Sequence, residues 1–227
     1  MTLLDFPGHI AATIFTPGCD MRCPFCHNSE LVTDSSDVEY YEDEVLAFLK
    51  TRVGKLDGIA ITGGEPLMQE DIKEFIKKVR ALGLKIKLDT NGTFPDKLSE
   101  LLSEGLVDYV AMDIKNCPDK WAKTAGLAGE GARLMFGKTL RSMGIIKASG
   151  IDYEFRTTIV KGLHELSDMD GLGTMVRGAK RYFLQNFTDS GAILNGTWGA
   201  WDKDTLLAML EVIRKYVPNA ELRGVDL

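Results

Sequence analysis

Short apolar runs that alternate with amphipathic stretches are the feature that most restricts how this chain folds. A short apolar run predicts a buried strand, and apolar residues recurring every three or four positions predict a helix. Residues 42–53 illustrate the helical pattern, since their apolar side chains fall on one face. The expected strands are residues 9–16, 58–62, 84–88, 107–114, 153–160 and 181–187, and the expected helices are residues 42–53, 71–82, 95–104, 133–147, 166–176 and 203–216.

Strands that alternate with helices of this length indicate a parallel sheet built from βα units. Six units are too few for the usual closed barrel of eight. The sequence also has no internal repeat, low-complexity tract or Pro/Ser-rich linker. We therefore expect an α/β protein with one domain over residues 1–227, folded as a partial (β/α)6 TIM-like barrel with its site at the C-terminal ends of the strands.

The unusual residue clusters of this chain follow the expected strands. They occupy residues 19–26, 63–66, 89–92, 113–115 and 185–187. Because the carboxyl ends of parallel strands meet at one edge of a sheet, these clusters are expected to gather on one face.

The overall charge and the apolar pattern exclude several kinds of partner. The formal net charge of -6 opposes binding to nucleic acid, which depends on clustered Lys and Arg. No apolar run approaches the roughly 20 residues that span a bilayer, and the first residues lack the layout of a signal peptide. We expect neither a membrane nor a nucleic-acid partner, and a cytoplasmic location.

Three of the four cysteines, Cys19, Cys23 and Cys26, lie within eight residues, whereas Cys117 stands alone. This uneven grouping favours metal binding over a disulfide framework. Three thiolates on one loop, residues 17–28, can ligate three irons of a four-iron cluster and leave the fourth iron open. An open coordination position is what a catalytic metal centre requires.

Two other uses of these cysteines remain open at this point. Cys117 could complete a structural cluster as a fourth ligand, although it follows a different expected strand. A structural zinc site could use His27 with the three grouped cysteines. That site is disfavoured because Cys26 and His27 are adjacent and can hardly both ligate one tetrahedral ion.

The segment at residues 19–28, CDMRCPFCHN, resembles the signature of the radical S-adenosylmethionine (SAM) superfamily. That signature has an aromatic residue just before its third cysteine, as Phe25 is here. The resemblance implies a [4Fe-4S] cluster on Cys19, Cys23 and Cys26, whose open iron is chelated by the methionine part of SAM. In that family an electron from the cluster then cleaves SAM and yields a 5'-deoxyadenosyl radical.

A short run of two glycines and a glutamate, Gly63, Gly64 and Glu65, directly follows an expected strand. Two glycines allow the backbone to approach a ligand closely, and a glutamate can accept hydrogen bonds from an ammonium group. Such a run is often only a turn. Its position here resembles the methionine-binding motif of the same superfamily, which implies that these residues bind SAM.

Asp89, Asp113 and Lys115 each end an expected strand, where they could simply cap the following turn. The pattern is closest to the activases of glycyl radical enzymes. That resemblance implies contacts of these residues with SAM and, in some members, with a monovalent cation. Lys115 would neutralise the carboxylate of SAM, and the aspartates would face the ribose, the ammonium group or the cation.

Arg156 and Gln185 are polar residues inside apolar strands, so each requires a partner. The partner is either another side chain or a ligand in the barrel mouth. In the second reading Gln185 points towards the adenosyl group and Arg156 towards the ligand or an incoming peptide. His164 is expected to be exposed in a loop, and the region of Trp198 and Trp201 packs under the last helix or lines a partner surface.

The resemblance covers essentially the whole chain and is closest to the activating proteins of the anaerobic ribonucleoside-triphosphate reductase. It is carried by residues 4–8, 62–66, 87–92, 107–115 and 153–158. It implies that the deoxyadenosyl radical removes a hydrogen from a glycine Cα of the reductase, with flavodoxin or ferredoxin as electron donor. One alternative is activation of pyruvate formate-lyase or another glycyl radical enzyme. An alternative of another class is a non-catalytic electron-transfer or metal-binding module.

Overall fold

One parallel sheet runs through the protein, and its strands lie side by side in the order in which they occur in the chain. The computed structural model describes residues 2, 4–33, 40–189, 191 and 193–225. The strands are β1 (Ala11–Thr16), β2 (Gly58–Gly63), β3 (Lys85–Thr90), β4 (Tyr109–Asp113), β5 (Asp152–Ile159), β6 (Tyr182–Asn186) and β7 (Glu221–Arg223). Every pair of neighbouring strands is parallel.

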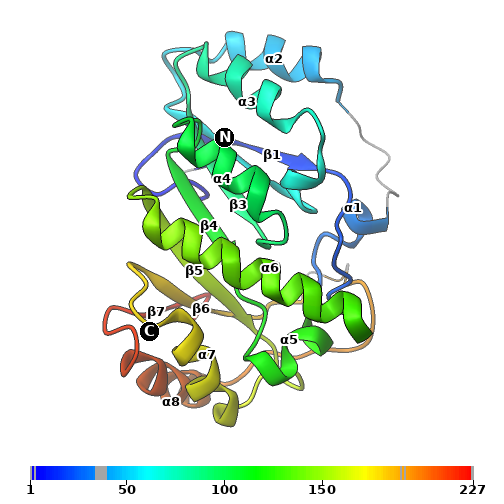
Figure 1. Cartoon of the computed structure of the whole chain (residues 1–227), viewed down its shortest axis with the longest axis vertical. Coiled ribbons are helices and arrows are strands. Elements are labelled where there is room, and N and C mark those ends of the chain that lie inside the picture. Colours follow the sequence, from blue (N-terminus) through cyan, green and yellow to red (C-terminus); the bar gives the residue numbers. More distant parts are fainter. Residues whose placement is uncertain (1, 3, 34–39, 190, 192, 226–227) are drawn as a thin grey trace.

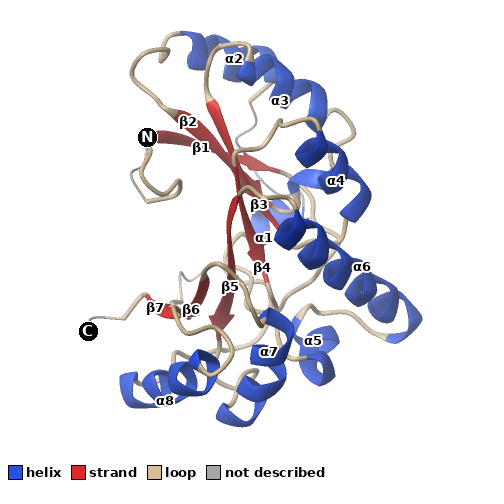
Figure 2. Cartoon of the chain, turned by 60° about the vertical axis from the view of Figure 1, so that its left-hand side comes forward, coloured by secondary structure: helices blue, strands red, loops and turns tan. Residues whose placement is uncertain are grey.

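The helices connect these strands, and most of them cover one face of the sheet (Figure 2). They are α1 (Ser29–Thr33), α2 (Glu42–Lys50), α3 (Ile72–Arg80), α4 (Pro95–Ser103), α5 (Pro118–Thr124), α6 (Gly129–Ala148), α7 (Met169–Val176) and α8 (Lys203–Arg214), with short 3₁₀ turns at Pro66–Met68 and Leu166–Asp168. Within the part of the chain that the structure describes, no helix has both the length and the apolarity to cross a bilayer.

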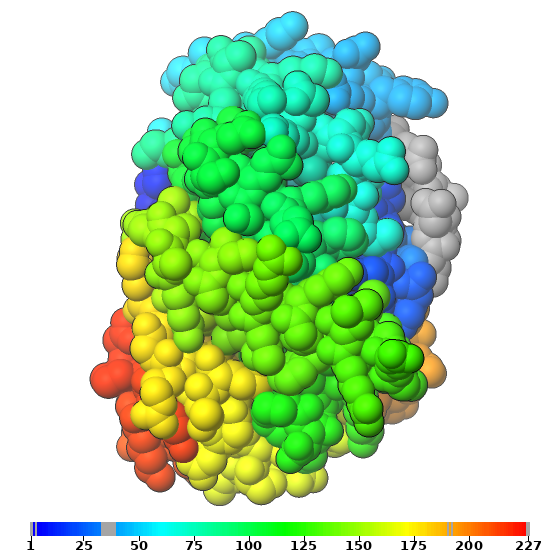
Figure 3. Space-filling model, in the orientation of Figure 1, coloured from blue at the N-terminus to red at the C-terminus, as the bar shows by residue number. Residues whose placement is uncertain are grey.

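Because each connection returns on the same side, the strand order never reverses, and the sheet is a partial TIM-like barrel rather than a doubly wound sheet. Figure 1 shows the helices following one another from α2 at one end of the long axis to α8 at the other. The space-filling view has the same succession of colours, from cyan to red (Figure 3). The expected α/β fold class is confirmed.

The six expected βα units are present, and β7 adds a seventh strand that no helix follows within the described residues. Its three residues, Glu-Leu-Arg, contain one apolar side chain and so carry no recognisable strand pattern. The helices α1 and α5 were also not expected. Only Trp121 and Thr124 of α5 are buried, which is too few to produce an amphipathic repeat.

The main core lies between the sheet and its helices. Alternate residues of β5 (Tyr153, Phe155 and Ile159) face this core, as a strand with one apolar face requires. In α3, Ile72, Phe75, Ile76 and Val79 are buried at helical spacing, and the basic residues between them face outwards. These two periodicities are what made the strands and helices recognisable in the sequence.

The opposite, inner face of the sheet carries a much smaller apolar cluster. Phe6 packs there with Ala11, Tyr109 and Ala111. Gly58 leaves room for the Phe6 ring, since a Cβ at this glycine would lie 3.0 Å from it. The segment before β1 therefore fills one end of the inner face, and the rest of that face is free to carry polar side chains.

Candidate functional site

A cavity of about 890 Å³ lies on the inner face, at the C-terminal ends of the strands. Small-molecule sites typically have volumes of about 300–1,000 Å³. The cavity brings together nearly all of the residues singled out from the sequence, and those that line it are Cys19, Cys23, Phe25, Cys26, Gly63, Gly64, Asp89, Asp113, Lys115, Arg156 and Gln185.

The loop that carries the three grouped cysteines, residues 17–28, is anchored by its alternate side chains. Met21, Cys23 and Phe25 are buried in a third apolar cluster, which we call the cysteine-loop cluster. Trp121 of α5 belongs to the same cluster and is itself buried. Since α5 was not expected from the sequence, this support for the cysteine loop was missed.

The three thiols fit the ligand set of a four-iron cluster. All four cysteines of the chain are free, and Cys19, Cys23 and Cys26 line the cavity together. Among the described residues, no group of three or more Cys, His, Asp or Glu side chains could hold a single metal ion. A four-iron cluster instead takes each cysteine on a different iron.

Burial determines the protonation of these thiols in the protein alone. It raises the pKa of the Cys23 thiol to about 11, although the nearby Lys115 charge acts in the opposite direction. Burial also raises the pKa of Cys19. Loading a cluster must therefore displace protons, and Lys115 is the cation beside the thiolates that would form.

Cys117 lies apart from this group. It is buried in the main core, and its sulfur is 3.8 Å from Oδ1 of Asp168. It is not among the residues that line the cavity. The structure thus gives no support to Cys117 as a fourth ligand.

The two glycines after β2 are required by a close approach of two loops. A Cβ at Gly64 would lie 1.8 Å from the carbonyl oxygen of Gly18, in the cysteine loop. Gly63 has a φ of 120°, and a Cβ there would lie 2.4 Å from the backbone of Thr16. The N–H of Glu65 donates to the Gly18 carbonyl at 2.8 Å. This run therefore locks the cysteine loop against the end of β2.

Glu65 is not among the residues that line the cavity, although the sequence resemblance implies that it binds SAM. The residue is fully buried and lies behind the cavity wall. Its carboxylate accepts hydrogen bonds from the N–H of Leu67, the hydroxyl of Thr90 and the N–H of Asn91, at 3.1, 2.9 and 2.7 Å. Burial nevertheless raises its pKa to about 7. Glu65 ties the end of β2 to the end of β3.

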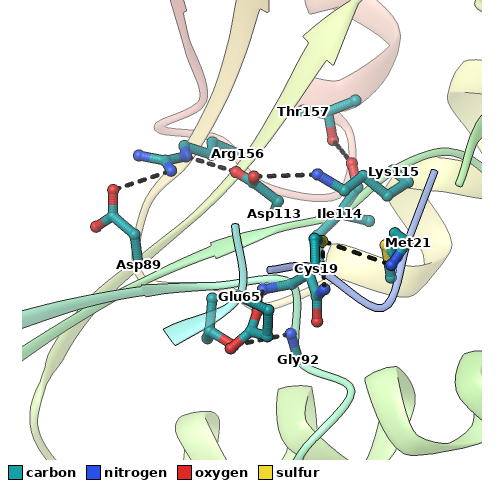
Figure 4. Close-up of polar contacts among 12 residues, drawn as sticks. Cys19, Met21, Glu65, Asp89, Gly92, Asp113, Ile114, Lys115, Arg156 and Thr157 are labelled. Atoms are coloured by element: carbon teal, nitrogen blue, oxygen red, sulfur yellow. Dashed lines mark hydrogen bonds and ion pairs between the residues drawn. The ribbon is translucent and has the colours of Figure 1, made fainter. Parts of the chain in front are cut away.

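A row of alternating charges crosses the cavity wall (Figure 4). Arg156 lies between two carboxylates, with Nη2 3.1 Å from Oδ2 of Asp89 and Nε 2.6 Å from Oδ1 of Asp113. Nζ of Lys115 is 3.1 Å from the other oxygen of Asp113. Lys87, which was not expected from the sequence to belong to the site, pairs with Asp89. Three cations thus face two carboxylates along this row.

These ion pairs keep Asp113 and Lys115 charged. Burial alone would raise the pKa of Asp113, but the charges of Arg156 and Lys115 outweigh it and hold that pKa well below its usual value. Burial alone would lower the pKa of Lys115, and the Asp113 charge outweighs it, so that the pKa lies above its usual value. Asp113 and Lys115 therefore present fixed charges to the cavity over the whole physiological pH range.

A second ion pair lies further along the inner face. Arg223 of β7 donates to both carboxylate oxygens of Glu154, at 2.7 and 2.9 Å, and its guanidinium stacks on the Phe183 ring at 3.4 Å. Tyr109 also donates to Glu154, at 2.8 Å. Lys87 and Glu154 could have been found from the sequence, because each is a charged residue inside an expected strand.

His164 is fully buried, so the expectation that it is solvent-exposed is wrong. Its Nδ1 accepts the N–H of Val160 at 3.2 Å, so Nε2 carries the hydrogen and donates to the carbonyl of Lys115 at 2.7 Å. Trp201 packs against the main core and donates to the His164 carbonyl. Trp198 packs against the cysteine-loop cluster.

Comparison with known proteins identifies the family of this chain. The family model described as "Radical SAM superfamily" matches residues 13–170. A protein of Methanocaldococcus jannaschii named as a glycyl-radical enzyme activating enzyme is 27% identical over 241 residues, covering 100% of this chain and 94% of the relative. A pyruvate formate-lyase-activating enzyme of Clostridium pasteurianum is 30% identical over 152 residues, covering 64% of this chain and 62% of the relative.

Solved structures share the fold. Streptococcus suis SuiB bound to S-adenosylmethionine has a TM-score of 0.71 at 17% identity, and the match covers 97% of this chain and 51% of that one. The structure described as native anSMEcpe with bound AdoMet has a TM-score of 0.65 at 15% identity, covering 91% and 60%. The chain thus spans about half to three fifths of these structures. Because the family model covers more than half of the sequence, this chain belongs to the radical SAM superfamily and is an enzyme of that kind.

Proposed function

We propose that this protein is a cytoplasmic activase that uses a [4Fe-4S] cluster and SAM to generate a glycyl radical in a partner enzyme. One observation carries the proposal: three free thiols and a row of fixed charges line the same cavity at the C-terminal ends of the strands. The proposal is also supported by the relative of nearly equal length, which is named as a glycyl-radical enzyme activating enzyme.

Cys19, Cys23 and Cys26 would hold the cluster, and their loop keeps water away from its buried side through the Met21 and Phe25 packing. When bound and reduced, the cluster supplies the electron that cleaves SAM into methionine and a 5'-deoxyadenosyl radical, which takes a hydrogen atom from a glycine Cα of the partner. The chain itself binds, orients and shields these groups.

The cavity wall offers a site for each part of SAM. Lys115 is a cation beside the thiols and suits the carboxylate of SAM. The exposed backbone of Gly63 and Gly64 lets the methionine part approach closely. Phe25 supplies an apolar wall next to Cys26, and Gln185, exposed at the end of β6, suits the adenosyl group.

Asp89 and Asp113 would face the ribose, the ammonium group of SAM or a monovalent cation, and Arg156 holds the two carboxylates in place. Both aspartates are partly exposed to the cavity. Arg156 would also approach the incoming peptide of the partner, since it lines the cavity between the two carboxylates.

The partner we favour is the anaerobic ribonucleoside-triphosphate reductase, with flavodoxin or ferredoxin as electron donor. The resemblance of residues 4–8 to the activating proteins of that reductase supports this choice. Activation of pyruvate formate-lyase is the second candidate. It is favoured by the similarity to the Clostridium pasteurianum activating enzyme.

The test begins with oxygen-free reconstitution of the protein with iron and sulfide. We expect a four-iron cluster whose reduced paramagnetic spectrum changes when SAM is added, together with formation of 5'-deoxyadenosine. Cys19→Ala, Cys23→Ala and Cys26→Ala should each abolish that product. Cys117→Ala is the matched control and should retain it, because this thiol lies outside the cavity. Tightly bound zinc and no response to SAM would contradict the proposal.

The partner is identified in a second experiment. The reduced, SAM-loaded protein is incubated separately with the reductase and with pyruvate formate-lyase, and the glycyl radical is followed by electron paramagnetic resonance. We expect a radical in the reductase only. A radical in pyruvate formate-lyase alone would transfer the assignment to the second candidate.

A further inference from the structure

Asn91, in the loop after β3, joins three loops that surround the cysteines. Its backbone N–H donates to Oε2 of Glu65 at 2.7 Å. Its side-chain Nδ2 donates to Oδ1 of Asp20 at 2.8 Å and lies 3.9 Å from the sulfur of Cys19. Its Oδ1 accepts both the N–H and the hydroxyl of Thr93, at 2.9 and 2.7 Å.

These contacts use the polar groups of the Asn91 side chain and fix its orientation. The residue is 6% exposed and lines the cavity. Because Thr93 provides two donors, the oxygen of the amide must point towards Thr93 and the nitrogen towards Asp20 and Cys19. The amide therefore presents N–H groups, rather than an acceptor, to the cysteine loop.

An N–H group that points at a cysteine sulfur has two effects on a cluster bound there. It holds the loop in place, as a buried hydrogen bond does. It also withdraws electron density from the sulfur and stabilises the reduced, more negative cluster, since hydrogen bonds to the sulfurs help to set the reduction potential. The backbone N–H of Met21 makes a similar contact with Cys19, at 3.5 Å.

We propose that Asn91 is a positioning residue that tethers the cysteine loop through Asp20 and tunes the cluster through an N–H···S hydrogen bond to Cys19. The tuning rests on the proposed function, because it requires a cluster at Cys19. The tether does not, because it exists in the protein without a cluster.

Two variants separate the tether from the sulfur contact. Asn91→Asp keeps the size of the side chain and the acceptor for Thr93, but removes the donor and places a carboxylate against Asp20. The double variant Asn91→Asp/Asp20→Asn exchanges donor and acceptor, so the link between the two positions is restored while the donor to Cys19 stays absent. Asn219→Asp, an exposed asparagine far along the chain, is the matched control.

The tether is tested in the protein without a cluster, by backbone hydrogen exchange over residues 17–28. The loss of one hydrogen bond predicts exchange about fivefold faster in Asn91→Asp. The double variant and Asn219→Asp should stay within about twofold of the wild type. Unchanged exchange in Asn91→Asp would overturn the tether.

The sulfur contact is tested by redox titration of the reconstituted proteins. At the wild-type midpoint, the ratio of reduced to oxidised cluster should fall about fivefold in both the single and the double variant. A double variant that titrates like the wild type would overturn the N–H···S contact. If the wild type itself holds no cluster, the proposed function and the tuning both fail, and the exchange experiment still decides the tether.

Discussion

At the scale of single residues, the buried carboxyl of Glu65 has a measurable effect on stability. Its pKa rises from 4.5 to about 7 in the folded protein because burial disfavours the charge. The folded state therefore holds this proton more tightly than the unfolded chain does. The stabilisation is complete below pH 4.5 and is lost as the pH rises through about 7.

Glu65→Gln removes this titration. The free energy of unfolding of the wild type, relative to Glu65→Gln, should fall by about 3 kcal/mol between pH 4.5 and pH 7. Urea unfolding followed by tryptophan fluorescence at several pH values measures the difference. Parallel stability curves for the two proteins would show that Glu65 does not change its protonation on folding.

His164 predicts a pH dependence of the opposite sign. Burial lowers its pKa from 6.5 to about 4, so the folded protein holds the neutral ring. The stabilisation is present above pH 6.5 and is lost as the pH falls through about 4. His164→Gln keeps a donor for the Lys115 carbonyl and does not titrate.

The wild type should therefore lose about 3 kcal/mol relative to His164→Gln as the pH falls from 6.5 to 4. The same urea titrations measure it. Since the Glu65 and His164 differences have opposite slopes, a general effect of acid on the protein cannot produce both. If the stability difference between the wild type and His164→Gln did not grow as the pH falls, the burial argument for His164 would be wrong.

At the scale of elements, the contact between the loops after β1 and β2 depends on Gly64. A Cβ added at Gly64 would overlap the carbonyl of Gly18, which is a backbone group and cannot rotate away. We expect Gly64→Ala to cost about 2–3 kcal/mol of stability and to lower the iron content after reconstitution. Urea unfolding and iron analysis measure the two effects.

Gly137→Ala is the matched control. Gly137 is exposed in α6, and a Cβ there would meet nothing within 4 Å. This change should stabilise the protein by about 0.5–1 kcal/mol, because alanine favours the helix, and should leave the iron content unchanged. Equal iron content in both variants would show that the loop contact does not support the site.

The elements also show what the sequence could and could not predict. The strands β1 to β6 were recognisable because each one faces the helices with apolar side chains. The short β7 was not recognisable, because it has no apolar pattern and its Arg223 instead pairs with Glu154. The clusters after the strands were found because parallel strands end at one edge, but the direction of the Glu65 side chain depends on partners in another loop.

At the scale of the whole molecule, the two faces of the sheet have different roles. The helices bury the outer face in one large core, and that packing supplies most of the apolar burial. The inner face carries the paired charges and the cavity, and its apolar part is the small cluster around Phe6. The stabilising core and the cavity thus lie on opposite faces of one sheet. The segment before β1 contributes apolar packing to the face that carries the cavity.

Phe6 tests this division. It is 2% exposed, packs with residues of β1 and β4, and its ring lies 6.1 Å from that of Tyr109. Phe6→Ala should lower the free energy of unfolding by about 3–5 kcal/mol, because removing the ring leaves a cavity between Ala11, Tyr109 and Ala111. Phe6→Leu should cost about 1 kcal/mol.

Leu4→Ala is the control from the same segment, since Leu4 is 90% exposed and should change stability by less than about 0.5 kcal/mol. Urea unfolding of the four proteins gives the comparison. If Phe6→Ala were as mild as Leu4→Ala, the inner-face cluster would not contribute to folding, and the outer core alone would hold the sheet in its curved form. If the free energy of unfolding of Phe6→Ala is instead far below that of the other three proteins, as we expect, the segment before β1 is an integral part of the barrel.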